Sequence, residues 1–341
     1  MMKNIKAMKR IILATAIVAM AVCLASCTNS MSGQKRGSSG KTLEVLVVAN
    51  KNVYYGNVKD SILALFHQPQ FGLNQPEQSF DVVNIPISSL ESTDMFKSHR
   101  NIIVVSVADS NQNKVSKAND RWAQPQVVFE FRLSSRDSVM PFLKRYYPII
   151  DQSIKECEHS RILRAYRGVE NYSLMQKLRD TFDFEITISN EYYLCDIDSD
   201  FAWLRKETND FSIGVIIRTL PYVKSTDFEQ KAILSHMDST MKRIPGFVDS
   251  SYMATDRRMD AETKRVDFND MYCVETRGIW HLEGKGFLSG PYVNYTLLSP
   301  DGETIVMITG YAQAPGKNKR DYLMQAESIC YTLKYIDKKE K

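Results

Sequence analysis

The chain has 341 residues, of which 43% are hydrophobic and 25% are charged, and its formal net charge is +4. This composition is that of an ordinary globular protein and excludes an intrinsically disordered chain. The charge excess lies at one end, because the first 26 residues hold four of the 44 basic residues and no acidic one. Without them the chain has 40 basic and 40 acidic residues, so net charge gives no support for nucleic-acid binding.

Residues 1–26 have the pattern of a secretory signal peptide. A basic start is followed by an apolar run, Ile11 to Leu24, which is too short to cross a bilayer as a helix. The run ends at Leu24-Ala25-Ser26-Cys27, which resembles a bacterial lipobox. This resemblance implies cleavage before Cys27 and lipidation of that cysteine. Residues 27–40 are rich in Ser and Gly and predict a flexible tether with an end-to-end distance of roughly 20 Å.

The region 41–170 alternates between strand and helix patterns, which predicts an α/β subdomain. Short apolar runs predict strands at 43–49, 80–85, 101–107 and 126–133. Apolar residues at helical spacing predict helices at 58–66 and 88–99. A longer helical region begins at Ser135, and Pro148 is expected to interrupt it.

The region 171–336 predicts an α+β subdomain, a mainly antiparallel sheet with helices packed on one face. Alternating patterns predict strands at 184–188, 192–195, 201–205, 212–218, 272–282, 292–298 and 303–311. Predicted helices cover 173–181 and 320–333, and a T-x-x-E capping box at 226–229 predicts the start of a third. Ser299-Pro300-Asp301-Gly302 predicts a hairpin turn. The fold class of the whole chain is therefore expected to be α+β.

Four cysteines follow Cys27, namely Cys157, Cys195, Cys273 and Cys330. They are widely spaced and form no C-x-x-C motif, so neither a redox motif nor a zinc knuckle is indicated. An oxidising compartment would permit disulfides in three alternative pairings, and the sequence does not choose among them. Each cysteine lies in an apolar segment, which favours buried free thiols.

No local pattern assigns catalytic, metal-binding or cofactor-binding residues. Asp196, Asp198 and Asp200 begin like an EF-hand loop, but Phe201 stands where that loop needs glycine, so an acidic turn between strands is the preferred interpretation. The five histidines have no zinc-site spacing. His281 and Glu283 are expected to share a strand face and could form an acid/base pair, but a surface strand with ordinary polar residues is the preferred interpretation.

Two further groups are candidates for binding. Arg161, Arg164 and Arg167 are three apart on a predicted helix and could contact an anionic partner, but a solvated helical face is the preferred interpretation. The aromatic residues, which include Trp122, could form a platform for a sugar or peptide, or belong to the core.

Four short strings carry a wider resemblance. They are Pro69–Glu77, Arg121–Gln126, Gly290–Val293 and Ala314–Arg320. Together with the lipobox they resemble an uncharacterised lipoprotein family of Bacteroidota, the domain of unknown function 4837. The resemblance runs from about residue 43 to 333 and implies a bacterial envelope location without implying any catalytic residue. In such bacteria, the lack of acidic residues just after the lipidated cysteine favours the periplasmic face of the outer membrane.

The sequence therefore predicts a cell-envelope lipoprotein that acts as a non-catalytic binding or structural module. Its expected partners are the membrane, through the lipid on Cys27, and an envelope protein or glycan, with no nucleic acid and no cofactor. The alternative is a periplasmic hydrolase whose site is assembled from residues distant in sequence. A small-ligand carrier is a third possibility and would need an apolar pocket between the two halves.

Overall fold

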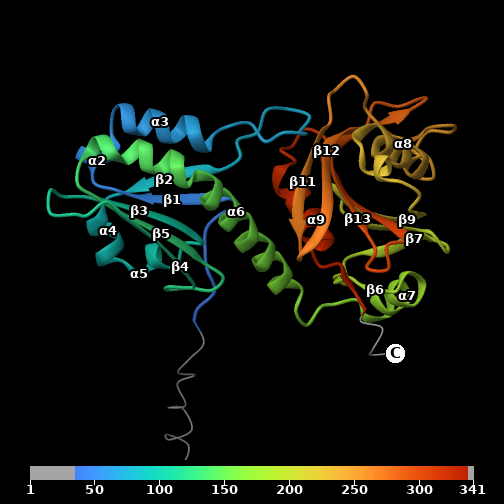
Figure 1. Ribbon diagram of the computed structural model, residues 1–341, viewed down its shortest axis with the longest axis horizontal. Helices are drawn as coiled ribbons and strands as arrows, with labels where there is room; N and C mark the ends of the chain where they lie inside the picture. Colours follow the sequence, from blue (N-terminus) through green and yellow to red (C-terminus); the bar gives the residue numbers. More distant parts are fainter. Residues whose placement is uncertain (1–34, 337–341) are drawn as a thin grey trace, which may run out of the picture. The chain divides into compact units, whose positions relative to one another are not determined.

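The computed structural model describes residues 35–336, so the predicted signal peptide and Cys27 lie outside the described residues. Most strands belong to two sheets, a five-stranded one within residues 44–133 and an eight-stranded one within residues 193–313 (Figure 1). A third, small sheet pairs β6 (Phe184–Glu185) with β15 (Lys334–Tyr335). This arrangement confirms the predicted α+β class with an α/β N-terminal half.

The first sheet has the strand order β2-β1-β3-β5-β4. Its four parallel strands are β1 (Glu44–Val48), β2 (Asp81–Ile85), β3 (Asn101–Val107) and β5 (Val127–Leu133). One face is covered by α2 (Lys51–Tyr54), α3 (Asn57–Phe66) and α6 (Val139–Tyr166). The short 3-10 helix η2 (Arg136–Ser138) directly precedes α6. The other face is covered by α4 (Ile87–Ser92) and α5 (Asp94–Lys97) (Figure 1). Because both faces are covered, the central strands are continuously apolar.

Two features of this half differ from the prediction. The single helix expected at 88–99 is two short helices, because Thr93 between them is extended. The strand β4 (Lys114–Asn119) was not predicted and pairs antiparallel with β5 at the sheet edge. Its polar sequence lacks an apolar pattern, and lysines at an edge strand discourage pairing with another chain.

The expected interruption of the long helix at Pro148 is wrong. Helix α6 is continuous through this residue, which lies on its exposed side. Leu143 and Ile150, on either side of the proline, are buried in the first core and hold the helix in place. Near its end, Tyr166 belongs to the core of the second half, so α6 contributes to both cores.

The second sheet has the order β10-β12-β13-β14-β9-β8-β7, with β11 also paired to β12. All of these pairs are antiparallel, and the strands are β7 (Tyr193–Ile197), β8 (Phe201–Glu207), β9 (Ser212–Pro221), β10 (Tyr252–Thr255), β11 (Glu262–Phe268), β12 (Met271–Glu283), β13 (Ser289–Leu298) and β14 (Thr304–Gln313). The predicted hairpin at 299–302 joins β13 and β14, and Gly302 has the positive φ of 75° that the turn needs.

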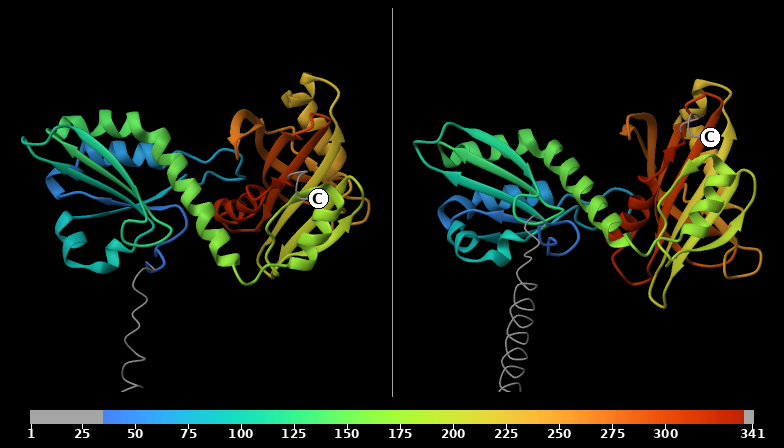
Figure 2. Two further views of the ribbon diagram at one scale, coloured as in Figure 1. Left: turned by 60° about the horizontal axis from the view of Figure 1, so that its bottom comes forward. Right: turned by 90° about the horizontal axis from the view of Figure 1, so that it is seen from below.

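Helices lie on both faces of the second sheet. On one face α7 (Tyr172–Phe182) and α9 (Arg320–Cys330) share a core with Ile217 of β9. Helix α8 (Gln230–Met241) packs with the neighbouring Ile216, whose side chain points to the opposite face. Helix α9 lies between the sheet and α6 (Figure 2). The sequence predicted helices on one face of this sheet, and α7 and α9 lie on one face as expected, whereas α8 covers the opposite face. Because both faces are covered, β13 and β14 are buried almost throughout.

The predicted capping box at 226–229 is wrong. Residues 225–228 form a 3-10 turn, η3 (Ser225–Phe228), and α8 begins only at Gln230, with Glu229 as its N-cap and no side-chain cap. The Asp227 carboxylate instead accepts hydrogen bonds from the backbone N–H groups of Val223 and Lys224, at 3.1 and 3.0 Å. Asp227 therefore stabilises the preceding turn, which delays the start of the helix.

Two of the strings that carried the family resemblance contact each other. Glu77, from the loop before β2, accepts hydrogen bonds from the backbone N–H groups of Lys319 and Arg320 at 2.7 and 2.9 Å, at the start of α9. Gln75 donates to Asn318 at 2.8 Å. A carboxylate at a helix N-terminus satisfies free N–H groups and complements the helix dipole. These strings therefore join the two halves of the fold.

Candidate functional site: the α7 groove

A groove of about 590 Å³ opens between α7, β6 and the chain that follows α9; we call it the α7 groove. Three segments between residues 163 and 187 and a fourth, distant one at residues 331–334 build it. Its lining residues are Leu163, Tyr172, Met175, Gln176, Arg179, Glu185, Ile186, Thr187, Tyr331, Thr332 and Lys334. The volume lies within the usual range for small-molecule and peptide-binding pockets.

The groove combines apolar and polar side chains. Tyr172 at the start of α7 is 70% exposed, and its hydroxyl donates to Glu170 at 3.3 Å. Arg179 and Glu185 form an exposed ion pair of 2.6 Å. Lys334 on β15 is exposed as well. The groove can thus offer ring stacking together with charged and hydrogen-bonding groups to one ligand.

An aromatic cluster supports the groove from behind. The ring of Tyr331 stacks on Phe268 with centroids 4.9 Å apart and an interplanar angle of 11°. The same ring lies 4.9 Å from that of Tyr295 and 4.6 Å from that of His159. The wall that Tyr331 forms is therefore held by packed rings, which favours a preformed binding surface.

A group of charged side chains lies next to these rings and includes the hydroxyl of Tyr295. We call this group the ion network: Glu275, Arg277, Tyr295 and Glu327. Arg277 lies between the two carboxylates, with Nε 2.8 Å from Glu275 Oε1, and it also forms an ion pair with Glu327. The Tyr295 hydroxyl lies 2.7 Å from Glu327 Oε1 and 3.1 Å from Glu275 Oε2. Lys264 reaches Glu275 from the rim, at 3.1 Å.

The ion network keeps both carboxylates ionised. Burial alone would raise the pKa of Glu275, but the Arg277 and Lys264 charges outweigh it and lower the pKa to about 2. The pKa of Glu327 is also lowered, because Arg277 and His159 outweigh the effect of burial. Neither group is a proton donor near neutral pH, so the network stabilises the fold behind the groove.

A buried pair of His159 and Ser328 lies next to the network. His159 Nδ1 is 2.9 Å from Ser328 Oγ, and this hydroxyl donates its hydrogen to the Met324 carbonyl oxygen at 2.6 Å. His159 must therefore donate to Ser328, whereas a general base would have to accept from it. Burial lowers the pKa of His159, and Ser328 is 0% exposed. The pair thus gives no support to the hydrolase alternative.

Of the three acidic residues, Asp196 lies in β7, and Asp198 and Asp200 lie in the turn between β7 and β8, which agrees with the preferred interpretation. Arg243, which follows α8, approaches all three carboxylates, at 2.5 Å from Asp198, 3.4 Å from Asp196 and 3.5 Å from Asp200. The hydrogen bond from Arg243 lowers the pKa of Asp198. Within residues 35–336 no cluster of three or more His, Cys, Asp or Glu residues is arranged to hold a metal ion.

The candidate pair His281 and Glu283 lies on β12, with Nε2 and Oε2 3.0 Å apart. It lies away from the α7 groove, whose lining it does not join. All four cysteines of the described part of the chain are free, with Cys273 and Cys330 buried. Burial raises the pKa of each of these two thiols, which makes them poor nucleophiles.

The three arginines on α6 have different surroundings. Arg161 donates to the backbone oxygen of Ser38 at 3.3 Å, and Arg164 donates to that of Gln124 at 3.0 Å. Arg167 is exposed just after the helix. The structure therefore brings two of them to the place where the chain enters the folded body.

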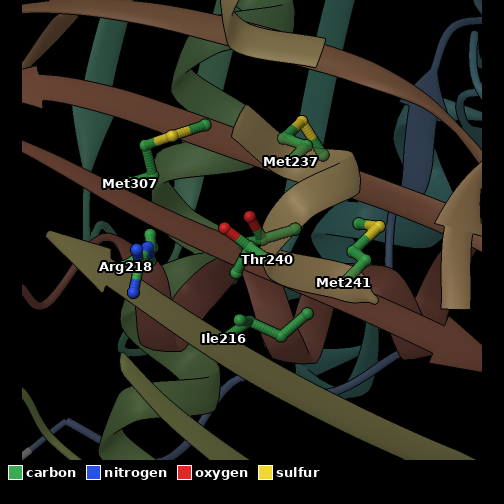
Figure 3. A pocket seen from close by; sticks show the side chains of 7 residues that line it. Ile216, Arg218, Met237, Thr240, Met241 and Met307 are labelled. Carbon is green, nitrogen blue, oxygen red and sulfur yellow. The ribbon is translucent and has the colours of Figure 1, made fainter. Parts of the chain in front are cut away.

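A much smaller cavity lies under α8 (Figure 3). Its volume is about 10 Å³, which is room for about one water molecule. Met237 and Met241 of α8 and Met307 of β14 line it, with Arg218 at one side. Methionines commonly fill irregular spaces in cores, and a nearby guanidinium disfavours a cation.

The sequence did not reveal the α7 groove. Its residues come from four separate segments and form no motif, and Tyr172 and Met175 read as parts of an ordinary amphipathic helix. The sequence contains one indication of the ion network. Glu327 lies within the apolar face of a predicted helix, beside Leu323 and Ala326. A buried acid in such a position requires a partner.

Comparison with known families covers both halves. Residues 171–332 match the family described as Domain of unknown function (DUF4837), and residues 38–167 match Domain of unknown function (DUF8532). Both matched families are of unknown function, which is consistent with an uncharacterised family. The DUF4837 part contains most of the α7 groove and the whole ion network, and the DUF8532 part contributes Leu163. No curated protein sequence matches the chain.

Solved structures resemble the protein only distantly. A crystal structure from Bacteroides thetaiotaomicron has 9% identity and a TM-score of 0.28, over 47% of each chain. CyanoP from Synechocystis has 12% identity and a TM-score of 0.32, over 45% of this chain and 87% of its own. LpqN, described as involved in cell envelope biogenesis of Mycobacterium tuberculosis, has 13% identity and a TM-score of 0.27, over 43% and 78%. No functional conclusion follows from likeness at this level. Within the described residues, no helix has the length and apolar character to span a membrane.

Proposed function

We propose that the protein is a lipid-anchored, non-catalytic binding module of the cell envelope, which binds its partner in the α7 groove. The observation that carries the binding function is the groove itself, about 590 Å³ with the exposed Tyr172 at its edge and a wall supported by packed rings. The lipobox resemblance at Leu24-Ala25-Ser26-Cys27 supports the anchor. The lack of acidic residues after Cys27 supports the periplasmic face of the outer membrane.

Binding fits the polar groups better than catalysis does. The groove's charged pair, Arg179 and Glu185, is mutually neutralised and exposed, which suits ligand recognition. The buried His159 donates to Ser328, and the ionised Glu327 belongs to the ion network. These potential acid/base groups therefore have structural partners.

The partner that fits the groove best is an extended segment of an envelope protein. Leu163, Met175 and Ile186 can receive apolar side chains, while Lys334 and the Arg179–Glu185 pair can contact a peptide backbone or charged groups. A glycan is the second candidate, because the exposed ring of Tyr172 can stack on a sugar.

The anchor is tested by metabolic labelling with a lipid precursor, followed by membrane fractionation. The wild-type protein should incorporate label and fractionate with the outer membrane, and Cys27→Ala should incorporate none. Equal labelling of both proteins would refute lipidation at Cys27.

The groove is tested by a photoreactive residue placed at Gln176 in intact cells. A matched position is Lys231 on α8, which is exposed on a different face of the second sheet. We expect one defined adduct from position 176 that is absent from position 231 and reduced at least several-fold by Tyr172→Ala. A protein adduct supports the first candidate and a glycan adduct the second. The same adducts from both positions would refute the groove as the binding site.

A further inference from the structure

The chain is fixed to the folded body as soon as it reaches residue 38. Ser38 N–H donates to the Gln124 carbonyl oxygen at 3.3 Å, and Ser39 N–H donates to that of Ser98 at 2.8 Å. The Arg100 guanidinium donates to the Gly40 carbonyl oxygen at 2.5 Å. The segment 38–40 is therefore bound against the region where α5 leads into β3, so the place where the chain enters the body is well defined.

The side chain of Gln126 holds the elements around this entry point together. Its Nε2 donates to the carbonyl oxygens of Lys97 and His99, each at 2.7 Å, and its Oε1 accepts from Trp122 N–H at 2.9 Å. Helix α5 and the segment 121–126 thus lie next to residues 38–40. The family string Arg121–Gln126 has its structural role here.

Cations and an aromatic ring collect at the same place, and we call this group the entry surface: Lys97, Arg121, Trp122, Arg164 and the partly buried Arg161, whose Nη1 is buried without a hydrogen-bond partner. Arg161 and Arg164 reach backbone oxygens of Ser38 and Gln124, and neither forms an ion pair within the described residues. Lys97 and Arg121 form exposed ion pairs with Asp94 and Glu130, at 3.0 and 3.3 Å.

Trp122 gives the entry surface an apolar component. The Arg121 guanidinium lies over its ring, 4.5 Å from the centroid, and the ring is only partly buried. Met95 on α5, which is 63% exposed, lies in the same region. Tryptophan beside arginine suits a surface that is apolar on one side and wet on the other.

The length of chain between the lipid and the entry point is short. Ten residues separate Cys27 from Ser38, and at about 3.5 Å per residue the full span is at most roughly 38 Å. If Cys27 is lipidated, the entry point therefore stays within that distance of the bilayer, and the entry surface lies beside the entry point.

We propose that the entry surface binds the anionic headgroups of the membrane in which Cys27 is anchored, and so orients the body on that membrane. This proposal rests on the lipid anchor of the proposed function. Guanidinium groups bind phosphate oxygens in a bidentate manner, and Trp122 would lie at headgroup level. Each cation near an anionic surface is worth about a fivefold change in partitioning, equivalent to about 1 kcal/mol.

The experiment uses the full-length protein with vesicles of phosphatidylcholine alone or mixed with phosphatidylglycerol. Flotation reports retention, and amide hydrogen exchange reports contact at residues 94–98 and 121–124. We expect flotation with both vesicles, and exchange at least fivefold slower at the entry surface only on the anionic ones. High salt and the double variant Arg121→Gln/Arg164→Gln should each remove that protection. The matched control is Lys144→Gln/Arg145→Gln, which removes two exposed cations about 30 Å away along α6 and should leave the protection unchanged.

Each outcome decides between the anchor and the entry surface. Flotation on both vesicles with equal exchange would overturn the entry surface and leave the anchor standing. Salt-dependent flotation on anionic vesicles alone, lost in the double variant, would support the entry surface and overturn the anchor. Protection that survives in the double variant, or is lost equally in the control, would overturn the entry surface.

Discussion

Each half of the molecule has an arginine that contacts a buried carboxylate, and the two arginines have different surroundings. In the second half, Arg277 meets two carboxylates, Glu275 and Glu327, and the Tyr295 hydroxyl completes the group. In the first half, Arg100 meets one carboxylate, Glu158 of α6, at 2.7 Å. The ion network is therefore a charge-rich cluster inside one core, whereas Arg100 connects α6, β3 and the entering chain.

The two sites also differ in how fully their hydrogen bonds are made. Among the described residues, Arg100 Nε and Asn101 Oδ1 are buried without a hydrogen-bond partner. No buried side-chain nitrogen or oxygen of the ion network lacks a hydrogen-bond partner. Unpaired polar groups in a core are costly, and fully paired networks are rigid. The comparison teaches that the ion network contributes a fixed wall for the α7 groove, and that the Arg100 region holds the entering chain with some bonds unmade.

The largest effect is expected from Arg277→Met. This change removes the cation that lies between two buried carboxylates, and only Lys264 at the rim still contacts one of them, Glu275. Breaking a buried pair typically costs about 3–5 kcal/mol. We expect a loss of unfolding free energy near the upper end of that range, measured by urea denaturation. Adding Glu327→Gln to the variant should recover part of the loss, because it removes one of the unpaired charges. A loss below about 1 kcal/mol would contradict a central role for the network.

A smaller loss is expected from Arg100→Met. Only Glu158 loses its cation, and Asn101 Nδ2 still donates to it at 3.1 Å. We expect about 3 kcal/mol, the lower end for a broken buried pair. Hydrogen exchange should also increase at Ser39, because the Arg100 contact to Gly40 is lost. If Arg100→Met is more destabilising than Arg277→Met, the comparison between the two arginines is wrong.

Acid should weaken the ion network in a defined pH window. The pKa of Glu275 is about 2 in the folded protein against an unfolded value of 4.5, so its stabilisation is complete above about pH 4.5 and is lost as pH falls toward 2. The loss should reach roughly 2 kcal/mol by pH 3. Unfolding of wild type and Glu275→Gln at pH 7, 4.5 and 3 measures it, and the gap between them should narrow with acid. A gap that stays constant over this range would show that Glu275 does not titrate as described.

The elements that the sequence predicted well are those whose environment is uniform. Strands β1 and β3 have helices on both faces, and their unbroken apolar runs identify them. Strand β4 is polar because it lies at an edge, so it left no apolar pattern. Pro148 was expected to break α6, but flanking core residues hold the helix together. In these two cases tertiary contacts determined the secondary structure, which the local sequence pattern did not.

The candidate site was less predictable than the fold. Glu275 and Arg277 are two residues apart on one strand with Thr276 between them, which reads as an ordinary polar segment until α9 is placed over it. The α7 groove requires α6, α7, β6 and the chain after α9 to meet, and no local pattern reports such a meeting. The sequence marks Arg161 and Arg164 as candidates for contact with an anionic partner. Only the fold shows that both lie beside the entering chain.

The smallest effect is expected at the contact between the two halves. Glu77→Gln removes the charge that faces the start of α9 but keeps one oxygen that can accept from Lys319 or Arg320. A charge at a helix N-terminus and a capping bond are worth about 1 kcal/mol, so we expect a loss of that size in urea unfolding. Glu303→Gln, which removes an exposed carboxylate, is the matched control and should change stability by much less. Faster hydrogen exchange confined to the first turn of α9 would show that Glu77 acts on that helix, and unchanged exchange there would mean that the loop before β2 does not cap it.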